Sequence, residues 1–233
     1  MKQIHEVALV SGLDSIVLYE MLSKNNPNIL PVYFKWGFDI DDAEIAKLPE
    51  GTVIHEIPEY LKFDVDIGSR ECVNLDGRDT IMMNMIMHIY KPSVIYKGTI
   101  LNDESYVESN FMFTQKIAHT WSLINRKTTE IKHPFQTKSK RDVIMLAEAM
   151  DINPLDFQYC YNESGNCGYC NKCRMTRLLS MYTSNPDIDF LNKFKAECED
   201  ETVRLTGNYI TQTDDVVGEI TRQIEGKYEH TIS

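Results

Sequence analysis

A short apolar run that ends in a serine–glycine turn constrains the fold of this chain more than any other feature. The run covers residues 7–10, Ser11-Gly12 follow it, and apolar residues return at helical spacing after Asp14-Ser15. In a strand–loop–helix of this kind, backbone N–H groups and the positive end of the helix dipole meet at the loop. The pattern therefore indicates an anion site that suits a phosphate group, with an ordinary strand–helix connection as the alternative.

Short apolar segments and amphipathic segments alternate through the first two thirds of the chain. The apolar segments predict strands at 7–10, 29–34, 53–57 and 94–97. The amphipathic segments predict helices at 15–23, 41–48, 79–90, 109–123 and 140–150. This alternation favours an α/β fold with a parallel sheet between layers of helices. Ligands of such sheets bind at the carboxyl ends of the strands, where the loop after Val10 would lie.

Composition narrows the class of protein and of partner. The chain has 233 residues and a net charge of −11, which disfavours a direct nucleic-acid partner because such partners need a basic surface. No apolar run is long enough to cross a bilayer. We expect a cytoplasmic protein with no membrane partner. Its length suits one large domain, or one domain with an appendage.

Four of the six cysteines crowd into one short segment, at Cys160, Cys167, Cys170 and Cys173. In a cytoplasmic chain, cysteines spaced so closely indicate a metal site instead of disulfides. Four thiolates satisfy the tetrahedral geometry of Zn2+, and an ion whose ligands all come from protein is structural. An iron–sulfur cluster is the alternative reading of the same spacing.

Several further motifs accompany the loop and the cysteines. They are Gly77-Arg78-Asp79 before a methionine-rich helix, Gly98 to Asp103 after a strand, Tyr106-Val107-Glu108, His133-Pro134 before Ser139-Lys140, and Arg177 after the last clustered cysteine. With these motifs, residues 5–178 resemble the 7-cyano-7-deazaguanine synthases of the PP-loop ATP pyrophosphatase superfamily. The resemblance implies a three-layer α/β fold, with a PP-loop nucleotide-binding domain over 1–155. It also implies a C-terminal zinc-binding segment with a helical tail, packed on that domain, over 156–233.

The resemblance also implies a reaction. ATP would adenylate 7-carboxy-7-deazaguanine, ammonia would displace AMP to give an amide, and a second ATP would drive dehydration to the nitrile. The implied cofactors are ATP, Mg2+ and structural Zn2+, and the family often forms homodimers. The implied catalytic residues are Asp14, Ser15, Arg78 and Lys140. The implied nucleotide and Mg2+ site comprises Leu9, Val10, Ser11, Gly12, Leu13, Asp14, Ser15, Gly98 and Asp103.

Some residues depart from the family pattern. Aligned without a gap, Val10-Ser11 stand where the family has Ser-Gly, whereas a gap keeps Ser11-Gly12 and leaves the loop one glycine short. Asp79 stands where the family has asparagine, and Glu108 replaces aspartate. These departures leave two alternatives open, a variant that stops at 7-amido-7-deazaguanine and a zinc-stabilised protein without catalysis. Two nucleic-acid readings are disfavoured by the acidic charge: tRNA thiolation by a PP-loop enzyme and binding by a zinc knuckle with a small basic face.

Overall fold

The computed structural model describes residues 4–38, 40–61, 77–101, 103 and 107–157. Its strands are β1 (Glu6–Leu9), β2 (Leu30–Lys35), β3 (Val53–Glu56), β4 (Val94–Tyr96) and β5 (Glu130–Lys132). Its α-helices are α1 (Leu13–Ser23), α2 (Ile40–Ile45), α3 (Arg78–Tyr90), α4 (Phe111–Asn125) and α5 (Lys140–Glu148). The described residues also form the short 3-10 helices η1 (Glu59–Leu61), η3 (Val107–Ser109) and η4 (Pro154–Asp156).

The five strands form one parallel sheet in the order β3-β2-β1-β4-β5. The chain builds outward from β1 to β3 on one side and then returns to place β4 and β5 on the other. The order therefore reverses between β1 and β4, and ligands of open parallel sheets bind beside such a reversal. The loops that follow β1 and β4 meet at this point.

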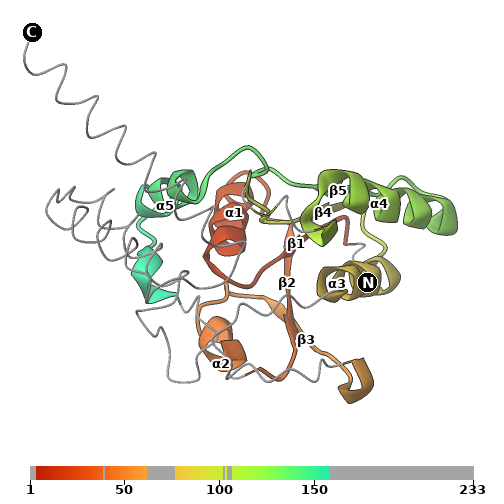
Figure 1. Ribbon diagram of the computed structural model, residues 1–233, viewed down its shortest axis with the longest axis horizontal. Coiled ribbons are helices and arrows are strands. Elements are labelled where there is room, and N and C mark those ends of the chain that lie inside the picture. The colour runs from red at the N-terminus through yellow and green to blue at the C-terminus, as the bar shows by residue number, and fades with distance from the viewer. Residues whose placement is uncertain (1–3, 39, 62–76, 102, 104–106, 158–233) are drawn as a thin grey trace, which may run out of the picture.

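Helices cover both faces of the sheet (Figure 1). Alternate residues of β1 point to opposite faces, as the period of a strand requires. Ala8 and Val10 pack with α1 and α5, whereas Val7 and Leu9 pack with α3 and α4. The expected α/β architecture with a parallel sheet between two helical layers is confirmed for the described residues.

The elements match the predicted ones to within a few residues, with two differences. β5 was not predicted, because Ile131 is its one buried apolar residue and both neighbours are exposed. The second difference lies in α3, where the apolar residues at helical spacing, which would form the buried face, are Ile81, Met82, Met85, Ile86 and Ile89. The structure instead buries Met83, Ile86 and Met87 most deeply and leaves Ile89 46% exposed. A helix with apolar residues on nearly every side does not define its own buried face, so contacts at its start must select that face.

Two expectations fall on other parts of the chain. The four clustered cysteines and the tail that follows them lie outside the described residues, as do the bounds of a second domain. Within the described residues, no helix is both long enough and apolar enough to span a bilayer.

Candidate functional site

The loop between β1 and α1 is closed by the hydroxyl of Ser15. The Ser11 N–H donates to Ser15 Oγ at 2.8 Å, and Ser15 Oγ donates to the Gly12 carbonyl at 2.9 Å. A hydroxyl has a single proton, so in this arrangement Ser15 has none left to donate to a phosphate. Leu9 and Val10 are buried in the sheet and the core, and they anchor the loop from below. Ser15 thus shapes the loop through both contacts of its hydroxyl.

Two glycines at this edge of the sheet serve different purposes. Gly12, the N-cap of α1, has an extended backbone that any residue adopts, with φ −82° and ψ −172°. A Cβ added to Gly12 would meet no described atom closer than Glu44 Oε1, at 3.9 Å. A Cβ added to Gly98 would lie 2.7 Å from the Cα of Ser15, inside van der Waals contact. Gly98 therefore lets the β4 loop pack on the start of α1, whereas a Cβ at Gly12 would make only an ordinary van der Waals contact with the described residues.

Lys140 of α5 and Asp14 of α1 form an ion pair next to this loop. Lys140 is the first residue of α5, and a capping box between Ser139 and Asp142 defines the start of that helix. Its Nζ lies 2.7 Å and 2.9 Å from the two carboxylate oxygens of Asp14. The two side chains are 15% and 26% exposed, respectively, so solvent reaches the pair. The structure thus brings together two residues that are 126 positions apart in the sequence.

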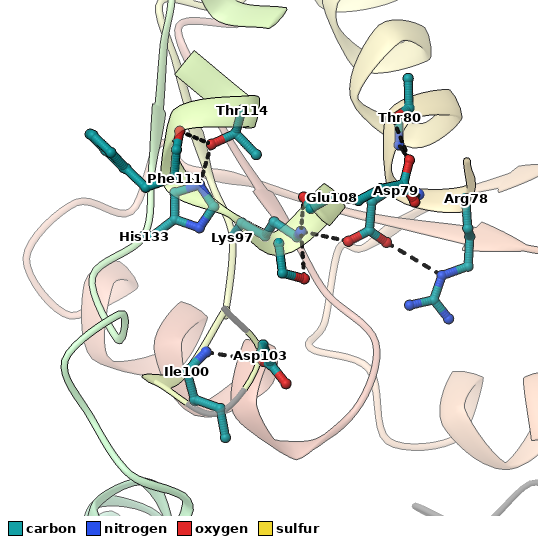
Figure 2. A network of polar contacts seen from close by, with 11 residues as sticks. Arg78, Asp79, Thr80, Lys97, Ile100, Asp103, Glu108, Phe111, Thr114 and His133 are labelled. Atoms are coloured by element: carbon teal, nitrogen blue, oxygen red, sulfur yellow. Dashed lines mark hydrogen bonds and ion pairs between the residues drawn. The ribbon is translucent and has the colours of Figure 1, made fainter. Parts of the chain in front are cut away.

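Asp103 adds a second carboxylate near Lys140 and Asp14. Its Oδ2 accepts from the Ile100 N–H at 3.1 Å (Figure 2). Burial and the negative charge of Asp14 raise the pKa of Asp103, although the Ile100 N–H and the charges of Lys140 and Lys97 oppose the rise. A carboxylate whose charge is disfavoured by its surroundings is one that a cation would stabilise.

The residues present fit a Mg2+ ion that is shared with bound phosphates. Asp14 and Asp103 supply the hard oxygen ligands that this ion prefers, and Mg2+ usually takes one or two carboxylates together with substrate phosphates. Lys140 holds both oxygens of Asp14, so Asp14 becomes available to an ion when Lys140 turns toward a phosphate. In the part of the chain that the structure describes, no group of three or more His, Cys, Asp or Glu residues could hold a metal by itself.

A separate polar network lies at the same edge of the sheet, on the side of α3 and α4 (Figure 2). Lys97 Nζ contacts Asp79 Oδ2 at 2.5 Å, and Arg78 Nε lies 3.4 Å from Asp79 Oδ1. Burial alone would raise the pKa of Asp79, but the charges of Lys97 and Arg78 and their hydrogen bonds outweigh it and hold this pKa below its usual range. Lys97 therefore offsets the charge that aspartate brings to position 79.

Glu108 completes this network by capping α3. Its carboxylate accepts from the backbone N–H groups of Asp79 and Thr80, both at 3.3 Å, and from the Thr80 hydroxyl. Residues from three motifs that are individually weak in the sequence thus converge at one place, namely Arg78-Asp79, Lys97 directly after β4, and Glu108.

Sequence reasoning missed two features of this edge. Lys97 was assigned to the end of a strand without a role, although a lysine after an apolar strand is a signal for a buried ion pair. The second feature is a cluster beside Gly12, in which the Tyr33 hydroxyl lies 2.7 Å from Asp41 Oδ1 and 2.9 Å from Glu44 Oε2. Burial and the two carboxylates raise the pKa of Tyr33, so its hydroxyl stays neutral. No motif connects these three residues in the sequence.

His133 is buried and contacts Thr114 of α4. The Thr114 hydroxyl donates to the Phe111 carbonyl at 2.9 Å, so it accepts from His133 Nε2, which lies 2.8 Å away. This arrangement places a proton on Nε2. The contact joins the end of β5 to α4 behind the network of Lys97 (Figure 2).

Comparisons with known proteins support one family. Residues 71–180 match the family model described as "Queuosine biosynthesis protein QueC". This match confirms the resemblance to the 7-cyano-7-deazaguanine synthases for that part of the chain, which contains the network around Lys97, Lys140 and the clustered cysteines. The U34-tRNA thiolase NcsA from Methanococcus maripaludis, solved with its 4Fe–4S cluster, is similar at a TM-score of 0.44 and 15% identity, over 84% of this chain and 74% of that chain. No curated protein sequence matches.

Proposed function

We propose that this chain, which resembles the queuosine biosynthesis family over residues 71–180, is an ATP-dependent C–N ligase acting on 7-carboxy-7-deazaguanine. The product is 7-cyano-7-deazaguanine, formed through an adenylated carboxylate and an amide. The observation that carries the proposal is the glycine at position 12, because neither its backbone angles nor its described neighbours require a residue without a side chain there. A phosphate group approaching the loop amides does require it.

The residues around the loop at 11–15 suit a triphosphate. The loop at 11–15 presents the start of α1, where the helix dipole favours an anion. Lys140 supplies a cation that exchanges Asp14 for a phosphate oxygen, and Asp14 and Asp103 then face the Mg2+ that offsets the remaining charge. Ser15 contributes by closing the loop, and Gly98 by packing against it.

The second substrate is an aromatic carboxylate, which we assign to the side of α3. Arg78 is the cation at this position, and guanidinium groups bind carboxylates in a planar, two-pronged geometry. Its side chain is 36% exposed and its Nε is oriented by Asp79. Placing the carboxylate opposite the α-phosphate of ATP allows the carboxylate oxygen to attack phosphorus as pyrophosphate leaves. Ammonia then attacks the acyl carbon, and AMP departs with the carboxylate oxygen.

The cysteines at 160, 167, 170 and 173 would hold structural Zn2+, and residues 156–233 would pack beside the α/β domain. This part of the proposal rests on the sequence alone. Metal analysis of the purified protein tests it, since a tetrathiolate zinc site predicts one zinc per chain and an iron–sulfur cluster predicts iron, sulfide and a brown colour.

The experiment that tests the reaction is mass spectrometry after incubation with ATP, Mg2+, ammonium and 7-carboxy-7-deazaguanine. We expect the nitrile together with AMP. An amide that accumulates would place the chain with the variants that stop after the first activation. Unchanged substrate without AMP, from a folded sample, would overturn the enzyme reading.

Gly12→Ala provides the matched variant for the proposed phosphate site. Alanine fits the backbone and the described neighbours, so the melting temperature should stay within about 2 °C of wild type. The affinity for ATP should fall at least about tenfold, which corresponds to ~1.4 kcal/mol, because the methyl group fills the space of a phosphate. Unchanged ATP binding by Gly12→Ala would remove the observation on which the site rests.

A further inference from the structure

We propose that Lys97 is a positioning residue that holds Arg78 at a fixed place relative to the loop at 11–15. It acts through Asp79 on one side and through its neighbour Gly98 on the other. The assignment of Arg78 to the substrate carboxylate rests on the proposed function, whereas the coupling between Lys97, Asp79 and Arg78 does not.

The contacts of Lys97 use its ammonium group completely. Nζ lies 2.5 Å from Asp79 Oδ2, 3.0 Å from the Glu108 carbonyl and 3.4 Å from Ser109 Oγ. An ammonium group has three protons, and three acceptors surround it here. Lys97 is also 9% exposed, so its charge is directed at the protein. Its role is therefore to hold other residues and not to contact a substrate.

Asp79 passes this constraint on to Arg78. One carboxylate oxygen faces Lys97 and the other faces Arg78 Nε, so the carboxylate lies between two cations (Figure 2). Asp79 is 8% exposed, and a buried carboxylate keeps the orientation that its partners impose. Without Lys97, Asp79 would keep Arg78 as a neighbour but lose the contact that fixes its own position.

Glu108 prevents α3 from moving independently of this pair. It binds the backbone of Asp79 and Thr80, while its own carbonyl accepts from Lys97. The start of α3, the η3 turn and the end of β4 are thus joined in a closed ring of contacts. The same contacts explain why α3 buries the face that contains Asp79, Met83 and Ile86, since these residues share one side of the helix.

Gly98 connects the ring to the proposed phosphate loop. It follows Lys97 directly, and its α-carbon lies so close to Ser15 that no side chain fits between them. The packing of Gly98 on α1 therefore fixes the backbone next to Lys97, and the lysine side chain extends from there to Asp79 of α3. The loop at 11–15, which would hold ATP, and the start of α3, which would hold the substrate carboxylate, are therefore positioned relative to each other by Lys97 and Gly98.

A double-mutant cycle with Lys97→Met and Asp79→Asn tests this coupling. Each single variant leaves one buried polar or charged group without its partner, so we expect each melting temperature to fall, that of Lys97→Met by roughly 10 °C. The double variant should recover at least half of the fall in melting temperature seen for Lys97→Met, because neither buried charge remains. Lys132→Met is the matched control, since Lys132 is 46% exposed and pairs with exposed Glu130. Additive single effects, or an unchanged melting temperature for Lys97→Met, would overturn the proposal.

The position of Arg78 needs a readout that stability alone does not move. In wild-type protein the Arg78 Nε–H should give a distinct, slowly exchanging NMR signal, identified by its absence in Arg78→Lys. Both Lys97→Met and the double variant should lose this protection. Retained protection in the double variant would show that Lys97 and Asp79 do not hold Arg78, and it would overturn the proposal without reference to any substrate.

Enzyme kinetics then separate this proposal from the proposed function. We expect the KM for the carboxylate to rise roughly tenfold in the double variant despite its recovered stability, with the KM for ATP changed less than about twofold. A KM that returns to the wild-type value with the melting temperature would show a merely structural role. If wild-type protein gives no turnover, the proposed function fails, and the thermal cycle and the NMR signal still decide the role of Lys97.

Discussion

The starts of α1 and α3 lie at the same edge of one sheet, yet they differ in how their helix dipoles are satisfied. A carboxylate from elsewhere in the chain, that of Glu108, caps α3 and binds its first backbone N–H groups. The N-cap of α1 is Gly12, which has no side chain to cap the helix, and the nearest described atom to an added Cβ there is 3.9 Å away. The nearby cation also differs, because Lys97 is surrounded by protein acceptors whereas Lys140 holds a partly exposed carboxylate.

This difference separates a helix start that is complete from one that awaits an anion. At α3 the negative partner is built into the chain, so the local charge is balanced before any ligand arrives. At α1 the balance rests on the solvent-accessible pair of Lys140 and Asp14, which costs little to open. Four substitutions sharpen or break this contrast.

Removing the cation beside α1 should have the largest effect. Lys140→Met leaves the Asp14 carboxylate without its cation, and because the two side chains are 15% and 26% exposed we expect a loss of roughly 1–3 kcal/mol of stability with the fold retained. Turnover of ATP to AMP should fall on the order of 100-fold, which is ~2.7 kcal/mol of transition-state stabilisation. Steady-state AMP release measures this effect, with Lys132→Met as the control. A rate within threefold of wild type would mean that Lys140 does not reach the phosphates.

Adding a methyl group at Gly98 should affect stability next most strongly. The new Cβ of Gly98→Ala meets backbone atoms of Ser15, which have little freedom to move, so we expect a loss of roughly 1–3 kcal/mol. Urea unfolding measures it, and Gly12→Ala is the paired control with almost no expected change. Equal losses at both glycines would contradict the distinction between a packing glycine and one that leaves room for a ligand.

Uncapping α3 should cost about 1 kcal/mol, as the loss of an N-cap usually does. Glu108→Gln keeps the shape of the side chain and one acceptor oxygen but removes the charge that favours the helix dipole. The thermal unfolding temperature should fall by a few degrees, and added phosphate should not restore it if this helix start is closed to anions. Stabilisation of Glu108→Gln, but not of wild type, by phosphate would show that α3 becomes an anion site once its carboxylate is neutralised.

The smallest expected effect is that of Asp103→Asn, which should stabilise the protein, whereas the other substitutions lower stability or activity. The pKa of Asp103 is raised in the folded protein, so the folded state binds a proton more tightly than the unfolded state does. Protonated Asp103 therefore costs less stability than ionised Asp103, and the folded protein loses stability as the pH rises through the folded pKa. Asp103→Asn retains an acceptor for the Ile100 N–H and removes the charge. It should therefore stabilise the protein at pH 7 by less than about 1 kcal/mol and lose this advantage near pH 3. Thermal scans at both pH values measure the difference, and destabilisation at pH 7 would contradict it.

The sequence predicted the strand–loop–helix at β1 because four consecutive apolar residues and a helical pattern are both local signals. It did not predict β5, whose single buried residue, Ile131, gives no periodicity. It pointed to Lys140 and Asp14 separately through their motifs, whereas their contact depends on how α1 and α5 pack. Asp79 looked like an unbalanced anion because Lys97, its partner, is 18 positions away and reaches it only across the end of β4.

The close approach of Gly98 to Ser15 also bears on how such proteins can be recombined. Residues near 98 and residues near 15 are far apart in the sequence but share one surface without room for a side chain. A chimera that transplants the first loop from a relative, and leaves the β4 loop behind, would join two surfaces that were never fitted to each other. The unit that can be exchanged between relatives is therefore the pair of loops, together with the lysine that precedes Gly98.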